Sequence, residues 1–526
     1  MTTTRPMART ALLLAVTALG LAACAPAGHG AAGSTAAAGG STSTSTSAPP
    51  AGTAAGTPAD GRLSWHACDR QFRCASLSAP VSYTQPSGGT LQVSVVELPA
   101  RDKPATAPDI VMNPGGPGAS GVQFLEGSAS SFPAVVLDHF NLVSFDPRGV
   151  GQSDPVRCVT SLSAYLRYLS LPPVPTAGFS VAQLVAADKS FADDCAAHTS
   201  RALLANVSTA DTARDMDRLR GALGQAKLDY LGFSYGTYLG TVYAEMFPAH
   251  VGAMVLDGAI DPALSTEAGD LVQAEGFEGD LHDFFAWCPT NSACSRELPS
   301  GAEKEYSAVM KRLAAGSTLT ANLVAAVGGS QPVDYGLGLL GVISALYSES
   351  FWPSLAQAIS EAMQGDGTDL AALAFSYADV NANGTFSNLL EANAAIGCLD
   401  HPVPAHLSQY PAFAAPAAEH APDFGPAEAW GPVGCLEWPV RSSAALAPAH
   451  LSRPLPILVV GSTRDPATPY AWAKALTSQL AGSELLTRTG DGHTGYFSSS
   501  CVEHYVDDYF LTGKRPPAGT VCASTS

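Results

Sequence analysis

The stretch YLGFSYGTYLG places Ser234 between two glycines at the point where an apolar run ends. The preceding segment, LDYLGF, is typical of a buried strand, and the following segment, YGTYLGTVYAEMF, is typical of a helix. A turn this tight between a strand and a helix leaves no room for flanking side chains, which explains the glycines at 232 and 236. The Gly-x-Ser-x-Gly pattern alone is weak evidence, but this context predicts a serine exposed above a sheet and available as a nucleophile.

Apolar runs of strand length recur along the chain and alternate with segments of helical periodicity. The strand-like runs are LQVSVVEL, DIVMN, FNLVSFD, LDYLGF, VGAMVLDG and, much further on, LPILVVG. This alternation predicts an α/β fold with a mostly parallel central sheet flanked by helices. We expect the sheet to be built from residues 61–262 and 446–526. Residues 263–445, where the strand signal stops, are expected to form a mostly helical insertion.

The N-terminus has the composition of an export signal over residues 1–23, in which Arg5 and Arg9 precede the apolar run ALLLAVTALGLAA. The run ends in Leu-Ala-Ala-Cys, which looks like the lipobox of bacterial lipoproteins and makes Cys24 a candidate for lipidation; cleavage that leaves Cys24 free is the alternative. Residues 24–60 are mainly Ala, Gly, Ser, Thr and Pro and predict a flexible tether. We therefore expect an exported protein, either anchored to the outer face of the bacterial membrane or released outside the cell.

The net charge and the cysteines limit the classes of partner and site that we expect. A net charge of −19 disfavours nucleic acid, because proteins that bind phosphates need a basic surface. Of the eleven cysteines, ten remain when Cys24 is set aside, and an even number is typical of exported proteins with disulfides. The spacings of zinc ligands do not occur, and we expect neither a metal site nor a cofactor. Sequence leaves the connectivity open, but pairing neighbours in order would give Cys68/Cys74, Cys158/Cys195, Cys288/Cys294, Cys398/Cys435 and Cys501/Cys522.

A nucleophilic serine needs a base, and the base needs a carboxylate that orients it. On a sheet of this kind the three residues follow in the order Ser, Asp, His. Asp465 lies just after the strand-like run LPILVVG, and His493 follows the next such run in the loop DGHTGYF. The rival base is His504, which lies within a predicted helix. The rival acid is Asp491, which is only two residues from His493 and better suited to a turn.

The loop DIVMNPGGPGASG is expected to supply part of the oxyanion hole. One N–H donor is expected from Tyr235, directly after the serine, and the second from Gly115 or Gly116 in this loop. The same loop contains Gly116-Pro-Gly118-Ala-Ser-Gly121, which matches a dinucleotide-binding fingerprint. A proline in the phosphate turn, a weak following helix and an exported chain argue against a dinucleotide.

Several longer motifs together resemble a known family. They are MNPGGPGASG, FDPRGVGQSDP, DMDRLRGALG, YLGFSYGTYLGTVYAEMFP, MVLDGAIDP, CLDHP, GSTRDPATPY and GDGHTGYF. Their sequence and order, from about Trp65 to Cys522, closely resemble the secreted tripeptidyl aminopeptidase family, α/β-hydrolases akin to prolyl aminopeptidases. The resemblance implies a triad of Ser234, Asp465 and His493. It also implies hydrolysis of peptide bonds near a free N-terminus through an acyl-enzyme, with the insertion acting as a lid.

The resemblance further implies a carboxylate near the lid that binds the substrate amine. Asp400, Glu275 and Glu278 are the candidates, and each also fits a solvated or structural role. Peptides are thus the expected partners. An esterase or lipase of the same fold is one alternative, because the same triad serves many leaving groups. A surface lipoprotein that binds solutes and lacks catalysis is another.

Four further charged residues are assigned to the scaffold. Asp146 and Arg148 in FDPRGVGQSD follow a strand, and we interpret them as a structural ion pair. Asp257 and Asp261 in LDGAIDP are assigned to turns.

Overall fold

The computed structural model describes residues 61–69, 71–323, 329–442, 444 and 446–523. The predicted signal peptide, Cys24 and the predicted tether over 24–60 lie outside these residues. Within the described ranges, no helix is both long enough and apolar enough to cross a bilayer.

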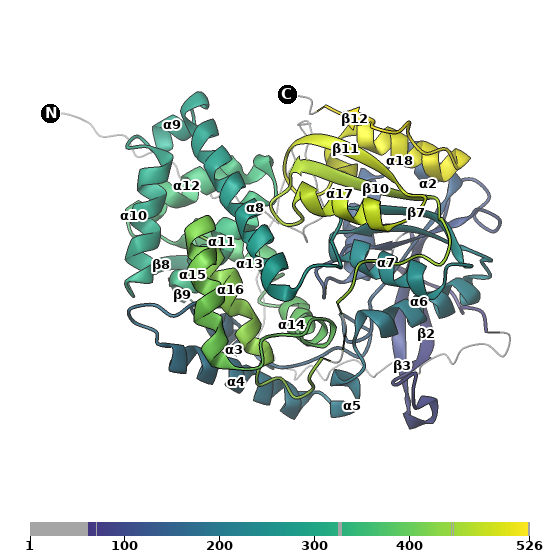
Figure 1. Ribbon diagram of the computed structural model, residues 1–526, viewed down its shortest axis with the longest axis horizontal. Coiled ribbons are helices and arrows are strands. Elements are labelled where there is room, and N and C mark those ends of the chain that lie inside the picture. The colour runs from purple at the N-terminus through teal and green to yellow at the C-terminus, as the bar shows by residue number, and fades with distance from the viewer. Residues whose placement is uncertain (1–60, 70, 324–328, 443, 445, 524–526) are drawn as a thin grey trace, which may run out of the picture.

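A large sheet forms the body of the molecule, with its strands in the order β1-β2-β3-β5-β4-β6-β7-β10-β11-β12 (Figure 1). From β5 to β12 every neighbouring pair is parallel, and the pairs on the other side are antiparallel. The expected α/β fold with a mostly parallel sheet is therefore confirmed. The strands are β1 (His66–Asp69), β2 (Phe72–Pro80), β3 (Thr90–Leu98), β4 (Asp109–Asn113), β5 (Asn141–Phe145), β6 (Leu228–Phe233), β7 (Val251–Asp257), β10 (Ile457–Arg464), β11 (Glu484–Asp491) and β12 (Val521–Cys522).

Helices cover both faces of the sheet, and β10 shows why its sequence is a continuous apolar run. Leu458 and Val460 pack into the core on one face, whereas Ile457 and Val459 pack into the core on the other. A strand buried on both faces needs apolar residues at every position rather than at alternate ones. The first face carries α1 (Gly121–Ser128), α2 (Ala134–His139) and α18 (Ser500–Thr512), and the second carries α6 (Thr209–Leu223), α7 (Tyr235–Met246) and α17 (Tyr470–Gln479).

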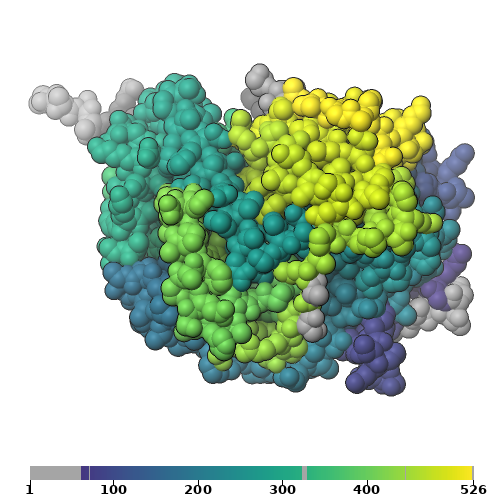
Figure 2. All heavy atoms as spheres, viewed as in Figure 1, coloured from purple at the N-terminus to yellow at the C-terminus, as the bar shows by residue number. Residues whose placement is uncertain are grey.

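The chain between β7 and β10 forms a helical lid that lies beside the sheet and encloses one side of it (Figures 1 and 2). A short hairpin, β8 (Leu319–Leu323) and β9 (Gly329–Val333), interrupts the helices and was not expected from the sequence. The lid helices are α8 (Thr266–Trp287), α9 (Cys294–Glu297), α10 (Ala302–Ala314), α11 (Tyr335–Leu346), α12 (Trp352–Met363), α13 (Thr368–Tyr377), α14 (Leu389–Asp400), α15 (Tyr410–His420) and α16 (Gly425–Trp430).

A second segment of the chain joins the lid. The connection from β5 to β6 contains α3 (Leu162–Leu169), α4 (Val181–His198) and α5 (Arg201–Leu204). Leu184 of α4 belongs to one apolar cluster with Tyr410 and Trp430 of the lid. Glu391 of α14 accepts the N–H groups of Cys158 and Val159 at 2.7 Å each. The lid is therefore anchored to the body through two separate stretches of sequence.

The charged turn after β5 differs from the expected ion pair. Arg148 is fully buried and pairs with Asp215 of α6, with Nε–Oδ2 at 2.7 Å and Nη2–Oδ1 at 2.8 Å. Asp146 instead accepts hydrogen bonds from Ser120 Oγ at 2.5 Å and from the N–H groups of Val122 and Gln152. Both charges serve the scaffold, but Arg148 binds α6 and Asp146 fixes the start of α1. The sequence could not identify Asp215, because it lies 67 residues further on.

Disulfides join the cysteines in the order that neighbour pairing predicted. The bridges are Cys68–Cys74, Cys158–Cys195, Cys288–Cys294, Cys398–Cys435 and Cys501–Cys522. Cys158–Cys195 ties α4 to the loop after β5, and Cys398–Cys435 closes the lid between α14 and the short helix over Gly431–Cys435. Cys288–Cys294 also lies in the lid, between the end of α8 and α9.

Candidate active site

Ser234 occupies the sharp turn between β6 and α7. Its φ of 55° and ψ of −125° are unusual for a residue with a side chain, and such strain is concentrated at functional sites. A Cβ on Gly232 would lie 2.5 Å from the carbonyl oxygen of Gly236, and one on Gly236 would lie 2.7 Å from that of Asn113. Both flanking glycines are therefore needed, because any side chain there would collide with backbone. The turn places Ser234 at the N-terminus of α7.

Asp465 and His493 meet in the loops that follow β10 and β11. His493 Nδ1 lies 2.9 Å from Asp465 Oδ1 and 3.1 Å from Oδ2. A carboxylate that accepts a hydrogen bond from Nδ1–H keeps the proton on that nitrogen. Nε2 then remains free to accept a proton. Nε2 is buried and has no hydrogen-bond partner among the described residues. This is the state that a general base needs before substrate binds, and its bond to the nucleophile often forms only in the complex.

The carboxylate of Asp465 is held rigidly. Oδ1 accepts the N–H groups of Ala467 at 3.1 Å and Thr468 at 2.8 Å. Oδ2 accepts the N–H of Thr494 at 3.2 Å and the hydroxyl of Thr468 at 3.0 Å. These donors fix the orientation of the carboxylate, and through it the orientation of the imidazole.

Ser234 and His493 both adjoin the end of β7. The N–H of Ser234 donates to the carbonyl oxygen of Asp257 at 2.8 Å. A Cβ on the next residue, Gly258, would lie 3.1 Å from His493 Cε1. The parallel register pairs Asp257 with Phe233 on one side and with Val460 on the other. Adjacent parallel strands thus bring the serine and the histidine to the same edge of the sheet.

The loop after β4 lies directly against the nucleophile. A Cβ on Gly115 would lie 3.0 Å from both Ser234 Cβ and the backbone nitrogen of Tyr235. The N–H of Gly115 already donates to Asn113 Oδ1 at 3.0 Å. Of the two glycines considered from sequence, Gly115 therefore has an engaged N–H, and Gly116 remains the candidate for the second donor. Tyr235 and Gly116 are thus the candidate donors of an oxyanion hole.

The glycines of the dinucleotide-like fingerprint serve close packing. A Cβ on Gly118 would lie 2.3 Å from the carbonyl oxygen of Leu389, and one on Gly121 would lie 2.2 Å from that of Phe145. The loop is thus pressed between the lid and β5. A phosphate-binding turn needs open space above its glycines, and backbone fills that space here.

Known proteins of similar sequence extend over most of this chain. "Serine protease Hip1" of Mycobacterium tuberculosis is 36% identical over 457 residues, which cover 85% of this chain and 87% of the relative. "Tripeptidyl aminopeptidase" of Streptomyces lividans is 30% identical over 489 residues, or 90% of this chain and 89% of the relative. The model of a family described as "TAP-like protein" matches residues 421–522. The chain belongs to the tripeptidyl aminopeptidase family.

Membership of the tripeptidyl aminopeptidase family makes the chain a serine hydrolase with the α/β-hydrolase fold. The names of its relatives indicate different kinds of cleaved bond. "Carboxylesterase B" of Mycobacterium tuberculosis is 35% identical over 502 residues, which cover 90% of this chain and 93% of the relative. The choice between peptide and ester substrates therefore has to come from the site.

The rival residues lie elsewhere. His504 is exposed on α18, where its ring contacts that of Tyr505. Asp491 makes a two-pronged ion pair with Arg464 instead of contacting an imidazole. The loop geometry thus favours Asp465 and His493 over these two rivals.

The three candidates for amine binding are engaged in other contacts. Asp400 is buried and accepts the N–H of Thr209 at 2.9 Å and its hydroxyl at 2.5 Å, and burial raises the pKa of Asp400 to about 7. Glu275 is exposed and lies 3.0 Å from the Nδ1 atom of His420. Glu278 is buried and accepts the N–H of Asp423 at 3.0 Å. Each of these contacts lies within the scaffold or at the surface.

Two further lid carboxylates were not identified from the sequence. Asp270 of α8 and Glu428 of α16 are partly exposed, and neither makes an ion pair within the described residues. Burial raises the pKa of Glu428 to about 7; burial, together with the charge of Glu428, raises the pKa of Asp270 well above its usual value. Glu428 interacts electrostatically with Tyr347, whose ring packs edge-on against His493 with the centroids 5.3 Å apart. No local sequence signal marks this pair, because α8 and α16 meet only in the folded lid.

Asp257 has a larger role than the turn assigned to it. Its buried carboxylate accepts the N–H of Gly495 at 2.8 Å and that of Tyr496 at 2.8 Å. Burial nevertheless raises the pKa of Asp257 to about 6. Asp257 therefore positions the loop that carries His493. Asp261 stays in its turn, where it accepts the N–H of Ala263 at 3.0 Å.

Proposed function

We propose that the protein is an exported serine exopeptidase that cleaves peptide bonds near free N-termini through Ser234, His493 and Asp465. The observation that carries the proposal is the buried imidazole of His493, which is bound at Nδ1 by Asp465, has no hydrogen-bond partner at Nε2 among the described residues, and adjoins the same strand end as the strained Ser234. The names of the protease and aminopeptidase relatives support peptides as substrates. The five disulfides support export to an oxidising compartment.

In the proposed reaction, Ser234 Oγ attacks the carbonyl carbon of the scissile peptide bond while its proton passes to His493 Nε2. Asp465 stabilises the imidazolium that forms. The N–H groups of Tyr235 and Gly116 bind the oxyanion of the tetrahedral intermediate. The imidazolium then protonates the leaving amine, which leaves an acyl-enzyme on Ser234. A water molecule, deprotonated by His493, hydrolyses that ester and restores the serine.

The lid supports the proposal of exopeptidase action. The α-amino group of a peptide is mostly protonated at neutral pH, and it needs an anionic partner when it is withdrawn from water. Asp270 and Glu428 supply carboxylates that make no ion pair within the described residues, and the charge of Glu428 acts on Tyr347, the ring that packs against His493. We therefore assign the substrate ammonium to this pair, in place of Asp400, Glu275 or Glu278. A peptide held there would present a bond close to its N-terminus to Ser234.

The test compares tripeptide p-nitroanilides with free and acetylated N-termini. We expect kcat/KM to favour the free amine on the order of 10²-fold, because acetylation leaves a partly buried carboxylate without its partner. Glu428→Gln is expected to remove most of this preference, mainly through KM. Glu419→Gln, an exposed lid substitution on α15, is the control and should keep the preference.

Each rival function predicts a different result in the same assays. The carboxylesterase relative favours an esterase, which would cleave simple esters and leave both peptide substrates intact. Such a result would disprove the peptidase assignment. An inactive binding lipoprotein would cleave neither class, and Ser234 would stay unlabelled by a fluorophosphonate.

The pH dependence of activity should follow His493. Burial lowers the pKa of His493, but the charge and hydrogen bond of Asp465, together with the charge of Asp257, outweigh it and raise the pKa above 6.5. The base acts only when neutral, and we expect kcat/KM to rise with pH through this pKa and to level off on the alkaline side. A pH profile with an uncharged ester substrate measures this. An acidic limb centred below 6.5 would contradict the prediction.

A further inference from the structure

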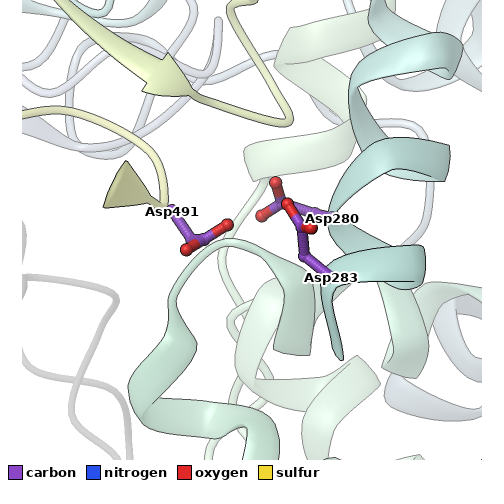
Figure 3. A group of neighbouring side chains, drawn as sticks. All are labelled: Asp280, Asp283 and Asp491. Atoms are coloured by element: carbon purple, nitrogen blue, oxygen red, sulfur yellow. The ribbon is translucent and has the colours of Figure 1, made fainter. Parts of the chain in front are cut away.

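Three carboxylates from the lid and the body converge in an acidic cluster of Asp280, Asp283 and Asp491 (Figure 3). Asp280 and Asp283 lie on α8, and Asp491 ends β11. Each residue offers one carboxylate oxygen, and these oxygens lie within 4.8 Å of one another. Like charges this close repel each other unless something positive lies among them.

Arg464 neutralises only part of the acidic cluster. Its Nε lies 2.5 Å from Asp491 Oδ1 and 3.2 Å from Asp283 Oδ2, and its Nη2 also bonds to Asp491. One guanidinium therefore serves two of the three carboxylates. The third, Asp280, is only 2% exposed, and its Oδ2 is buried without a hydrogen-bond partner among the described residues.

An unpartnered buried carboxylate is costly, because it has lost its hydration without gaining a donor or a cation. Figure 3 shows the carboxylate of Asp280 beside that of Asp283, with both turned toward the space in front of Asp491. Asp280 thus faces the acidic cluster from its buried side. A small cation that several oxygens can share would supply the missing partner.

We propose that the acidic cluster binds one divalent cation of the calcium type, with one oxygen from each aspartate and water in the remaining positions. An all-oxygen ligand set suits a hard cation and disfavours zinc. Calcium tolerates irregular geometry and six to eight ligands, whereas magnesium demands a near-ideal octahedron. No metal site was expected from the sequence, because these ligands have no characteristic spacing and Asp491 lies far along the chain from α8.

The position of the acidic cluster gives the cation a role in the site. Asp491 lies two residues before His493, and Arg464 directly precedes Asp465. On the lid side, Gln273 of α8 donates to the carbonyl oxygen of Ala467 at 2.5 Å, in the same loop as Asp465. A cation bound between Asp280 and Asp491 would fasten the lid helix to the loops of both Asp465 and His493. Asp280, Asp283 and Asp491 are thus positioning residues.

The experiment uses the full chain stripped of metal with a chelator, and it follows calcium binding by isothermal titration calorimetry and by thermal unfolding. We expect one saturable site with a Kd of about 10⁻⁴–10⁻³ M, the range of extracellular calcium modules. At ten times the Kd the melting temperature should rise by about 2 °C. Magnesium should bind more weakly. These readouts do not require catalysis, and failure of the peptidase proposal would leave them unchanged.

Asp280→Asn provides the decisive variant. It should abolish the heat of calcium binding and the shift in melting temperature, while the metal-free variant melts no lower than the metal-free wild type, because a charge repulsion has been removed. Glu303→Gln, an exposed substitution on α10, should respond to calcium like the wild type. If Asp280→Asn fails to fold, Asp283→Asn tests the same loss. No saturable binding by the wild type, or binding that persists in the aspartate variants, would overturn the proposal.

Discussion

Replacing Ser234 with alanine is expected to lower kcat for the peptide substrate by about 10⁶-fold, as loss of the nucleophile does in other serine peptidases. The hydroxyl has no substitute at the turn, because Gly232 and Gly236 carry no side chain and the hydroxyl of Tyr235 is buried against Thr209. Residual turnover of about 10³–10⁴ over the uncatalysed reaction would come from the oxyanion hole and from substrate binding. Steady-state hydrolysis and labelling by a fluorophosphonate both measure the loss.

The control for Ser234→Ala is Ser163→Ala, which removes an exposed hydroxyl from α3. It should retain full activity and full labelling. Alanine and serine meet similar backbone strain at a φ of 55°, and the melting temperature of Ser234→Ala should stay close to that of the wild type. If the variant retains more than about a hundredth of the activity, a nucleophile other than Ser234 performs the reaction.

The parts of the site that sequence predicted are those encoded locally. The strand, the two glycines and the helix around Ser234 lie within a few residues of one another, and backbone collisions alone require the glycines. Asp465 and His493 each follow an apolar strand, and parallel strands deliver their ends to one edge of the sheet. The family resemblance implied the same three residues, in the order Ser, Asp, His that the strands already indicated.

The parts that sequence did not predict depend on contacts between distant segments. Asp215 of α6 binds Arg148 in the turn after β5, and Glu428 approaches Asp270 only when α16 packs on α8. Such pairs have no periodicity and no fixed spacing, because lid packing rather than local conformation brings them together. The acidic cluster was not predicted for the same reason. From the sequence, Asp491 was assigned to a turn.

Asp465→Asn is the second substitution with a large expected effect, a fall in kcat of about 10⁴-fold. An amide that turns its N–H₂ toward His493 Nδ1 would force the proton onto Nε2, so that the imidazole could no longer accept the proton of Ser234. An amide that turns the other way would place its N–H₂ against the N–H donors of Ala467 and Thr468, or of Thr494. Either orientation loses hydrogen bonds, and a lower melting temperature should accompany the lower kcat.

The pH profile separates a catalytic role of Asp465 from a purely structural one. Asp465 is the main group that raises the pKa of His493, and the acidic limb of kcat/KM in Asp465→Asn should move to lower pH. Asp261→Asn alters a carboxylate in a turn outside the triad, and both kcat and the acidic limb should stay unchanged. If Asp465→Asn keeps the wild-type limb while Asp491→Asn shifts it, Asp491 orients the imidazole in solution. The loop after β11 must then differ from the one described, because Arg464 holds Asp491 away from the ring here.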